Sequence, residues 1–153
     1  MTTLSERSNF LDAPFFPEGM TTPEPSDPIN GGYFAAAAEG RLVVQACADC
    51  GTRQYPPELN CHACYGFEMT WEESAGTGTV YSWVEVAHPA HPALREFGPY
   101  MVALVELDDM PEIKLMGAVV DAPLGGTMAI GARVQVAFEQ TSDDLSQPRW
   151  QMA

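Results

Sequence analysis

The chain has 153 residues, 46% of them hydrophobic, which fits one domain or two small modules that share a core. Its formal net charge is −14, and its seven basic residues stand singly. This argues against a nucleic-acid partner, since such binding needs clustered Lys and Arg. No apolar run approaches the roughly 20 residues of a membrane span, and no secretion signal opens the sequence, so we predict a cytoplasmic protein with no membrane partner.

The first predicted segment is an extended N-terminal arm, residues 1–29. It is rich in Pro, Ser, Thr and acidic residues, a composition that favours an extended chain over a packed element. The arm nevertheless carries apolar side chains that are costly to leave in water: Phe10, Leu11, Phe15 and Phe16. It therefore either lies on its own domain or docks on a partner, and we expect its aromatic rings to be part of a partner contact.

A short helix is predicted next, beginning at Asp27-Pro28, where Asp would cap it and Pro would take the first helical position. The helix is expected to end near Gly40. Gly31 and Gly32 should weaken its first turn. Its apolar face would pack in the fold or contact a ligand or partner, and consists of Tyr33, Phe34 and Ala37.

A strand predicted at residues 41–47 leads into the cysteine segment. All four cysteines lie there, as two C-x-x-C pairs around a ten-residue loop: Cys47, Cys50, Cys61 and Cys64. Zinc favours four thiolates in a tetrahedron, and four protein sulfurs leave no open position for catalysis. We therefore predict one structural Zn²⁺ per chain, held in a zinc ribbon. A redox C-x-x-C normally begins a helix in a βαβ unit, whereas these flanks are typical of strand and turn.

The two cysteine knuckles differ in one position. Gly51 follows Cys50 and permits the positive φ that such a turn needs. Tyr65 takes the equivalent place after Cys64, so a distorted second knuckle is expected. His62 is a further candidate ligand, but thiolates should displace it.

From Thr77 onward the sequence predicts strands separated by turn-forming segments. Gly76, Gly78 and Gly117 suggest bulges or sharp bends that would curl the sheet into a barrel. The fold class is therefore mainly β: the arm (1–29), a helix plus rubredoxin-like zinc ribbon (30–74), and a five-stranded OB-type barrel (75–153). The predicted barrel strands are 77–88, 100–108, 113–122, 133–141 and 149–153.

No catalytic residue is predicted. Since all four cysteines are assigned to metal, a nucleophilic thiolate would have to come from another subunit. His88 and His91, in "HPAHP", suit an irregular loop, and Asp108-Asp109 and Asp143-Asp144 are typical of turns. Two tryptophans are expected in the core or at the ribbon–barrel junction: Trp71 and Trp83.

Residues 30–153 as a whole resemble the zinc-ribbon/OB-fold family associated with acyl-CoA metabolism, long classed as a domain of unknown function. The shared pattern runs from an aromatic helix through two C-x-x-C knuckles around an aromatic-Pro-Pro loop to a Gly-x-Gly-x-Val strand. His62 stands where the family usually has Pro, and the arm before residue 27 is outside the pattern. The matching positions are Tyr33, Phe34, Gly40, Arg41, Leu42, Cys47, Cys50, Gly51, Tyr55, Pro56, Pro57, Cys61, Cys64, Trp71, Gly76, Gly78 and Val80.

The resemblance implies a non-catalytic accessory subunit of an acyl-CoA-processing complex. Such proteins accompany thiolase-superfamily enzymes that act as thiolases or retro-aldol lyases, and others accompany MaoC-like enoyl-CoA hydratases. The barrel would help to hold a CoA thioester or shape the partner's active site, with Arg53 and Arg41 as candidate contacts to the CoA phosphates. The alternatives are an autonomous acyl-CoA or fatty-acid-binding protein and, against the charge, a nucleic-acid-binding OB protein.

Overall fold

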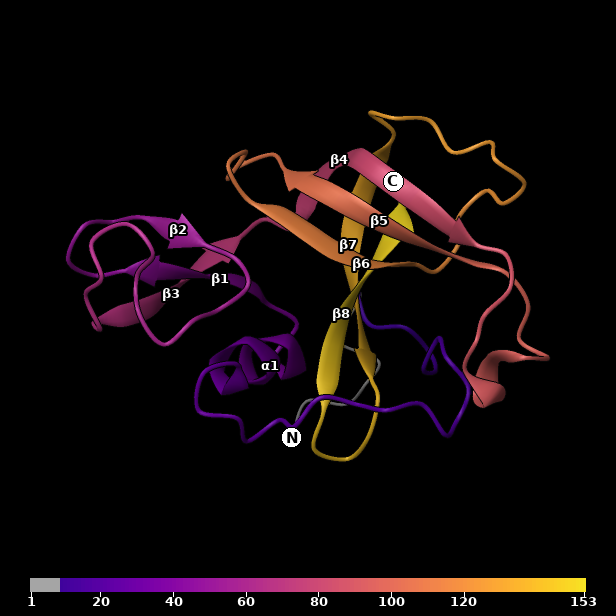
Figure 1. Ribbon diagram of the computed structural model, residues 1–153, viewed down its shortest axis with the longest axis horizontal. Helices are drawn as coiled ribbons and strands as arrows, with labels where there is room; N and C mark the ends of the chain where they lie inside the picture. The colour runs from indigo at the N-terminus through magenta and orange to yellow at the C-terminus, as the bar shows by residue number, and fades with distance from the viewer. Residues whose placement is uncertain (1–8) are drawn as a thin grey trace.

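The structure, a computed structural model, describes residues 9–153. Residues 1–8, which belong to the predicted arm and to the segment searched for a secretion signal, lie outside this range. Figure 1 shows a small sheet on one side, a larger barrel on the other, and a short helix between them. The mainly β fold with a four-cysteine ribbon and a closed five-stranded barrel is confirmed. In the described part of the chain, no helix has the length and hydropathy of a membrane span.

The small sheet carries the cysteine segment and has the strand order β2-β1-β3, all antiparallel. Its strands are β1 (Leu42–Cys47), β2 (Arg53–Gln54) and β3 (Met69–Ser74). β1 matches the predicted strand at 41–47, and every one of its residues is buried because strands flank it on both sides. β2 and β3 were not predicted. β3 pairs with β1 along its full length, from Leu42↔Ser74 to Cys47↔Met69.

The helix, α1 (Gly31–Ala38), begins later than predicted. Asp27 Oδ1 accepts hydrogen bonds from the N–H groups of Ile29 and Asn30, both at 2.8 Å, so Asp27 caps a turn that precedes the helix. Gly40, with φ +73°, ends the helical segment as predicted. Gly32 has a packing role instead, since a Cβ there would lie 2.2 Å from Trp71 Nε1. Trp71 therefore joins β3 to the helix.

The barrel closes in the order β4-β5-β6-β8-β7. Only the β6–β8 pair is parallel among these strands. A short 3-10 helix, η2 (Pro92–Leu94), lies in the connection between the first two barrel strands. Every second residue of β5 has a fully buried side chain in the barrel core: Met101, Ala103, Val105 and Leu107. The strands are β4 (Thr77–Val86), β5 (Tyr100–Leu107), β6 (Lys114–Val119), β7 (Arg133–Gln140) and β8 (Ser146–Met152).

The predicted bends and bulges at glycines are confirmed at Gly76 but not at Gly78. The register shift in β4 lies at Tyr81, between Val80 and Ser82, so the bulge is not at a glycine. Gly78 instead allows the backbone of β5 to approach β4 closely, because a Cβ there would lie 2.3 Å from the carbonyl oxygen of Glu106. Gly76 does form a sharp bend, with φ +77°.

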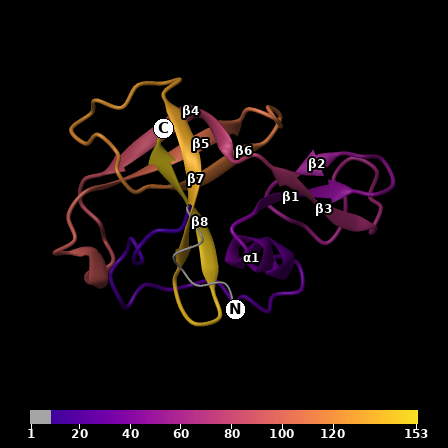
Figure 2. The same ribbon diagram turned by 180° about the vertical axis from the view of Figure 1, so that it is seen from behind.

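The arm, from residue 9 onward, lies on its own barrel, along the β7–β8 hairpin (Figures 1 and 2). Leu11 N–H donates to Phe138 O at 2.7 Å, and Phe138 N–H donates to Asn9 O at 2.9 Å, so Phe10 forms a parallel bridge with Phe138. The arm therefore lies on its own domain, one of the two predicted alternatives, and a partner contact by its rings stays a prediction because Phe10, Phe15 and Phe16 remain half-buried. Two of these rings pack within the chain, in a cluster with ring centroids 5.0 to 6.3 Å apart: Phe15, Phe16, Phe97 and Tyr100.

Candidate metal centre and the surrounding residues

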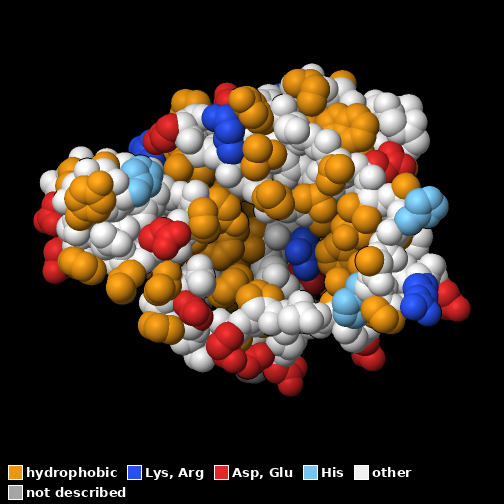
Figure 3. Space-filling view, in the orientation of Figure 1, with side chains coloured by type: hydrophobic (Ala, Val, Ile, Leu, Met, Phe, Trp, Pro, Cys, Tyr) orange, Lys and Arg blue, Asp and Glu red, His pale blue; other side chains and the backbone are white. Residues whose placement is uncertain are grey.

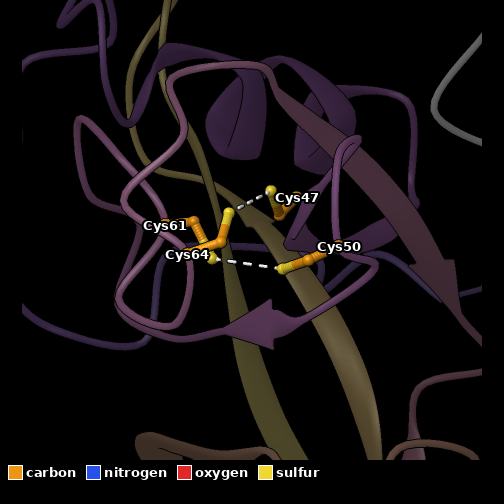
Figure 4. A group of neighbouring side chains, drawn as sticks. All are labelled: Cys47, Cys50, Cys61 and Cys64. Atoms are coloured by element: carbon orange, nitrogen blue, oxygen red, sulfur yellow. Dashed lines mark hydrogen bonds between the residues drawn. The ribbon is translucent and has the colours of Figure 1, made fainter.

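The four cysteine sulfurs converge on one point (Figure 4). All four lie within 4.8 Å of one another, with Cys47–Cys64 and Cys50–Cys61 Sγ separations of 3.6 Å. These separations are far longer than a disulfide bond, and the thiols are free. The cluster is therefore positioned to bind a metal ion, and a four-sulfur donor set suits Zn²⁺.

The two knuckles have the same turn. Gly51 N–H donates to Cys47 O at 2.9 Å, and Tyr65 N–H donates to Cys61 O at 3.0 Å. Gly51 has φ +77° and Tyr65 has φ +63°. The expected distortion of the second knuckle was therefore wrong: the backbone keeps the turn, and Tyr65 adopts the left-handed conformation that costs a non-glycine residue roughly 1–2 kcal/mol.

This strain gives a prediction. We expect Tyr65→Gly to tighten zinc binding by about threefold to tenfold, because relief of roughly 1 kcal/mol in the folded ribbon adds to the metal affinity. Competition with a chromophoric chelator measures the change. The control is Tyr81→Gly, the same substitution at an exposed position of β4. It should lower barrel stability and leave zinc affinity unchanged; equal zinc affinities of Tyr65→Gly and the native chain would contradict the argument.

Two buried glutamines hold the loop between the knuckles, and the sequence analysis missed them. Gln54 Nε2 donates to Gln45 Oε1 at 2.8 Å and to Asn60 O at 3.0 Å, while Gln45 Nε2 donates to Glu58 O at 2.8 Å. Gln54 Oε1 also accepts the His62 N–H at 2.9 Å. The glutamine pair thereby fixes the backbone that carries Cys61, whereas His62 contributes only its backbone.

The two exposed thiols of the cluster, Cys50 and Cys64, have opposite pKa shifts. Hydrogen bonds with the side chain and backbone of Thr52 lower the pKa of Cys50 to about 6, which favours its thiolate. The hydrogen bond from the Gly66 N–H lowers the pKa of Cys64. Hydrogen bonds with the sulfurs of Cys47 and Cys50 raise it by more, so that the pKa is about 12. Metal binding must therefore release protons, and the affinity should fall as the pH is lowered.

The two arginines predicted to contact CoA phosphates already have carboxylate partners. Arg53 binds Glu72 through Nη2 at 2.6 Å and Nε at 3.0 Å, and its Nη1 lies 2.9 Å from Glu112. These hydrogen bonds raise the pKa of Arg53, and Arg53 lowers the pKa of Glu72. Arg41 lies 3.1 Å from Glu39 and 3.6 Å from Glu73. Either arginine would have to exchange these carboxylates to hold a phosphate, so this role stays a prediction.

Two of the remaining candidates, His91 and Asp109, have structural roles. His91 Nδ1 accepts the Ala93 N–H at 3.1 Å and caps η2, while His88 is exposed in the same loop. Asp109, predicted as a turn residue, also accepts hydrogen bonds from Ser74 Oγ at 2.8 Å and Ala75 N–H at 2.7 Å. It thereby ties the β5–β6 turn to the ribbon–barrel junction, which Arg53 also bridges through Glu112.

One buried ion pair was not predicted at all. Glu139 on β7 is 1% exposed, and its Oε1 lies 2.5 Å from Arg149 Nε on β8. The same carboxylate accepts the Phe15 N–H at 3.3 Å and the Thr141 hydroxyl at 2.9 Å. The pair therefore also fastens the arm to the hairpin.

A four-sulfur ribbon leading into a closed five-stranded barrel defines the class of zinc-ribbon/OB-fold proteins. Two family models match: the rubredoxin-like zinc ribbon domain of ChsH2 over residues 34–70, and the C-terminal OB-fold domain of ChsH2 over residues 71–139. A solved structure, the "Ltp2-ChsH2(DUF35) aldolase", is 35% identical with a TM-score of 0.72, covering 85% of this chain and 98% of that chain. The chain belongs to the ChsH2/DUF35 family, as the sequence resemblance predicted.

Other relatives differ in length and context. A "DUF35 domain-containing scaffold protein" of Methanocaldococcus jannaschii is 29% identical over 105 residues, covering 67% of this chain and 71% of that protein. A "Probable enoyl-CoA hydratase alpha subunit" of Thermomonospora curvata is 48% identical over 80 residues, or 52% of this chain. The match spans only 24% of that hydratase subunit. A DUF35 structure from Sulfolobus solfataricus, 17% identical with a TM-score of 0.54, covers 85% of this chain and 89% of its own and shares the fold.

Proposed function

We propose that this chain is a non-catalytic partner subunit of an acyl-CoA-processing enzyme, most directly an enzyme of the thiolase superfamily acting as thiolase or retro-aldol lyase. One Zn²⁺ on Cys47, Cys50, Cys61 and Cys64 would hold the ribbon in shape. The barrel would complete the partner's site for a CoA thioester.

The observation that carries the proposal is an apolar outer face on the barrel, formed by β4, β5 and β6. Val84 pairs with Val102, and Leu104 pairs with Met116, all at positions alternate to the buried core residues of β5. Val84 is 56% exposed and Met116 is 66% exposed. The solvent face of an antiparallel sheet is normally polar, and a contiguous exposed apolar patch usually marks an interaction site.

The charge of the chain favours a different protein over a second copy on this face. Two chains of net charge −14 repel each other, and the repulsion opposes self-association. The names of the relatives support an enzyme as the partner, because they include an aldolase complex, an enoyl-CoA hydratase subunit and a scaffold protein.

The residues available for chemistry support a non-catalytic role. In the described part of the chain, all cysteines lie in the ribbon cluster. His91 is engaged in capping η2, so the "HPAHP" loop has no evident acid–base pair. A reactive thiolate would come from the partner.

A second candidate partner is a MaoC-like enoyl-CoA hydratase. The 48% identity to part of a hydratase alpha subunit favours it. The same apolar face would serve either enzyme, so co-expression with each distinguishes them.

The complex gives a further prediction. We expect Val84→Asp to weaken assembly with the partner enzyme by about tenfold or more, because a buried charge replaces an apolar contact worth about 1.5–3 kcal/mol. Pull-down and turnover assays on co-expressed subunits measure this. Leu124→Asp, at an exposed apolar residue outside the face, is the control and should assemble normally. Turnover of acyl-CoA by the chain alone, or no complex with either enzyme, would refute the proposal.

A further inference from the structure

A hollow opens between the arm, the helix and the ribbon, and a single cation stands in it. Two adjoining cavities, of about 420 Å³ and 220 Å³, share Gln147 and Arg149 in their walls. Figure 3 shows a basic side chain in the hollow centre of the molecule, with hydrophobic side chains on both sides. Of the residues that the structure describes, Arg149 is the one basic residue in either wall, and we call the two cavities together the Arg149 groove.

Arg149 is held in place and still has hydrogen-bond donors to offer. Its side chain is 14% exposed, its Nε donates to the buried Glu139, and its guanidinium lies 5.3 Å from the centre of the Phe16 ring. Among residues 9–153, the two terminal nitrogens of Arg149 have no hydrogen-bond acceptor. A fixed guanidinium with open N–H groups presents the fork that a carboxylate or phosphate accepts.

The walls of the groove favour an apolar ligand body. Phe16, Pro17 and Met20 line the larger cavity, and Tyr33, Phe34 and Tyr55 line the smaller one. The larger cavity is by itself within the usual size range of small-molecule sites, without the volume of the smaller one.

The acidic residues around the groove favour a ligand with one negative charge over a ligand with two. Glu139 and Glu18 line the same cavity as Arg149, in a chain of net charge −14. A phosphate dianion would meet more repulsion there than a carboxylate.

We infer that the Arg149 groove binds a monocarboxylate with an apolar chain, whose carboxylate accepts hydrogen bonds from the terminal nitrogens of Arg149. The groove is formed by this chain alone, and the inference is tested on the isolated chain, although Met116 of the proposed docking face also lines the smaller cavity. Anion recognition is thereby placed at Arg149, whose ion pair with Glu139 uses only Nε. It is not placed at Arg53 or Arg41, whose ion pairs engage their terminal nitrogens as well.

Titration of the full-length, zinc-loaded chain with decanoate, 1-decanol and decyl phosphate tests this, by calorimetry or by amide chemical shifts. Decanoate should bind about tenfold to a hundredfold more tightly than 1-decanol, the range expected for hydrogen bonds to a charged group. Decyl phosphate should bind more weakly than decanoate. Glu139→Gln/Arg149→Gln, which replaces the ion pair with two amides, should abolish the preference for decanoate over decanol. The control, Asp108→Asn/Arg133→Gln, removes an exposed Arg–Asp pair and should retain it.

Two comparisons test the inference even if the Glu139→Gln/Arg149→Gln variant does not fold. The first is the native preference for decanoate over decanol, which needs no substitution. The second is Met20→Trp, which narrows the groove away from the ion pair and should weaken both decanoate and decanol. Equal native affinity for decanoate and decanol, tighter binding of decyl phosphate, or unchanged decanoate binding in Met20→Trp would each overturn the inference. So would a folded Glu139→Gln/Arg149→Gln chain that still prefers decanoate.

Discussion

Replacement of Cys61 by serine should abolish stoichiometric zinc binding and unfold the ribbon, while the barrel keeps its strands. Cys61 is fully buried, and its sulfur lies 3.6 Å from that of Cys50. A neutral serine hydroxyl does not replace a thiolate ligand, and structural zinc contributes roughly 10–16 kcal/mol in small zinc-bound modules. We expect the remaining contacts of the ribbon not to replace the metal, since one of its three strands is only Arg53–Gln54.

Elemental analysis of protein purified without chelator, together with amide spectra, measures both effects. The native chain should carry one zinc per chain, and Cys61→Ser well under one, with loss of dispersed ribbon signals. Ala63→Ser is the matched control, because it adds a hydroxyl beside the cluster and removes no sulfur. A native chain with little zinc and its thiols paired as disulfides would contradict the prediction.

Substitution of Arg149 by methionine should lower the free energy of unfolding by about 3–5 kcal/mol. Glu139 is 1% exposed and would lose its counter-charge in a buried position, together with its 2.5 Å hydrogen bond from Arg149. The carboxylate also anchors the Phe15 N–H, so the arm should loosen at the same time. Denaturation in urea, followed by tryptophan fluorescence, measures the loss.

Two further variants separate the lost charge from the lost packing. Glu139→Gln/Arg149→Met should recover most of the stability, because glutamine keeps an acceptor for Phe15 and removes the unpaired charge. Arg133→Met, which breaks the pair with Asp108 at a side chain that is 53% exposed, should cost less than about 1 kcal/mol. An equal decrease in the free energy of unfolding for Arg149→Met and Arg133→Met would show that the buried pair contributes no more to stability than the exposed one.

The sequence by itself determined the elements whose signal is local. The C-x-x-C spacing brings sulfurs together within short turns, so the four-cysteine cluster could be predicted from its own segment. The alternation of β5, with every second residue buried, is a period-2 pattern that identifies a strand without knowledge of its neighbours. Gly40 ended the helical segment because positive φ is a property of one residue.

Pairing between distant segments overrode other local signals. β3 forms despite its acidic residues because β1 supplies a complete partner strand. The last strand was predicted to begin at residue 149, yet β8 begins at Ser146 and includes Pro148, which lies opposite Phe138. The N–H and C=O groups of Phe138 are bonded to the arm, so the strand pairing requires no N–H from Pro148.

The metal knuckle and the Arg149 groove were also decided by the tertiary structure. Tyr65 adopts a left-handed backbone because the knuckle that carries Cys64 requires it, against the preference of tyrosine itself. The Glu139–Arg149 pair joins two strands and the arm, and the groove needs the helix and the ribbon as well. Such sites depend on which segments meet, and the burial that gives their charges energetic weight arises only when the chain has folded.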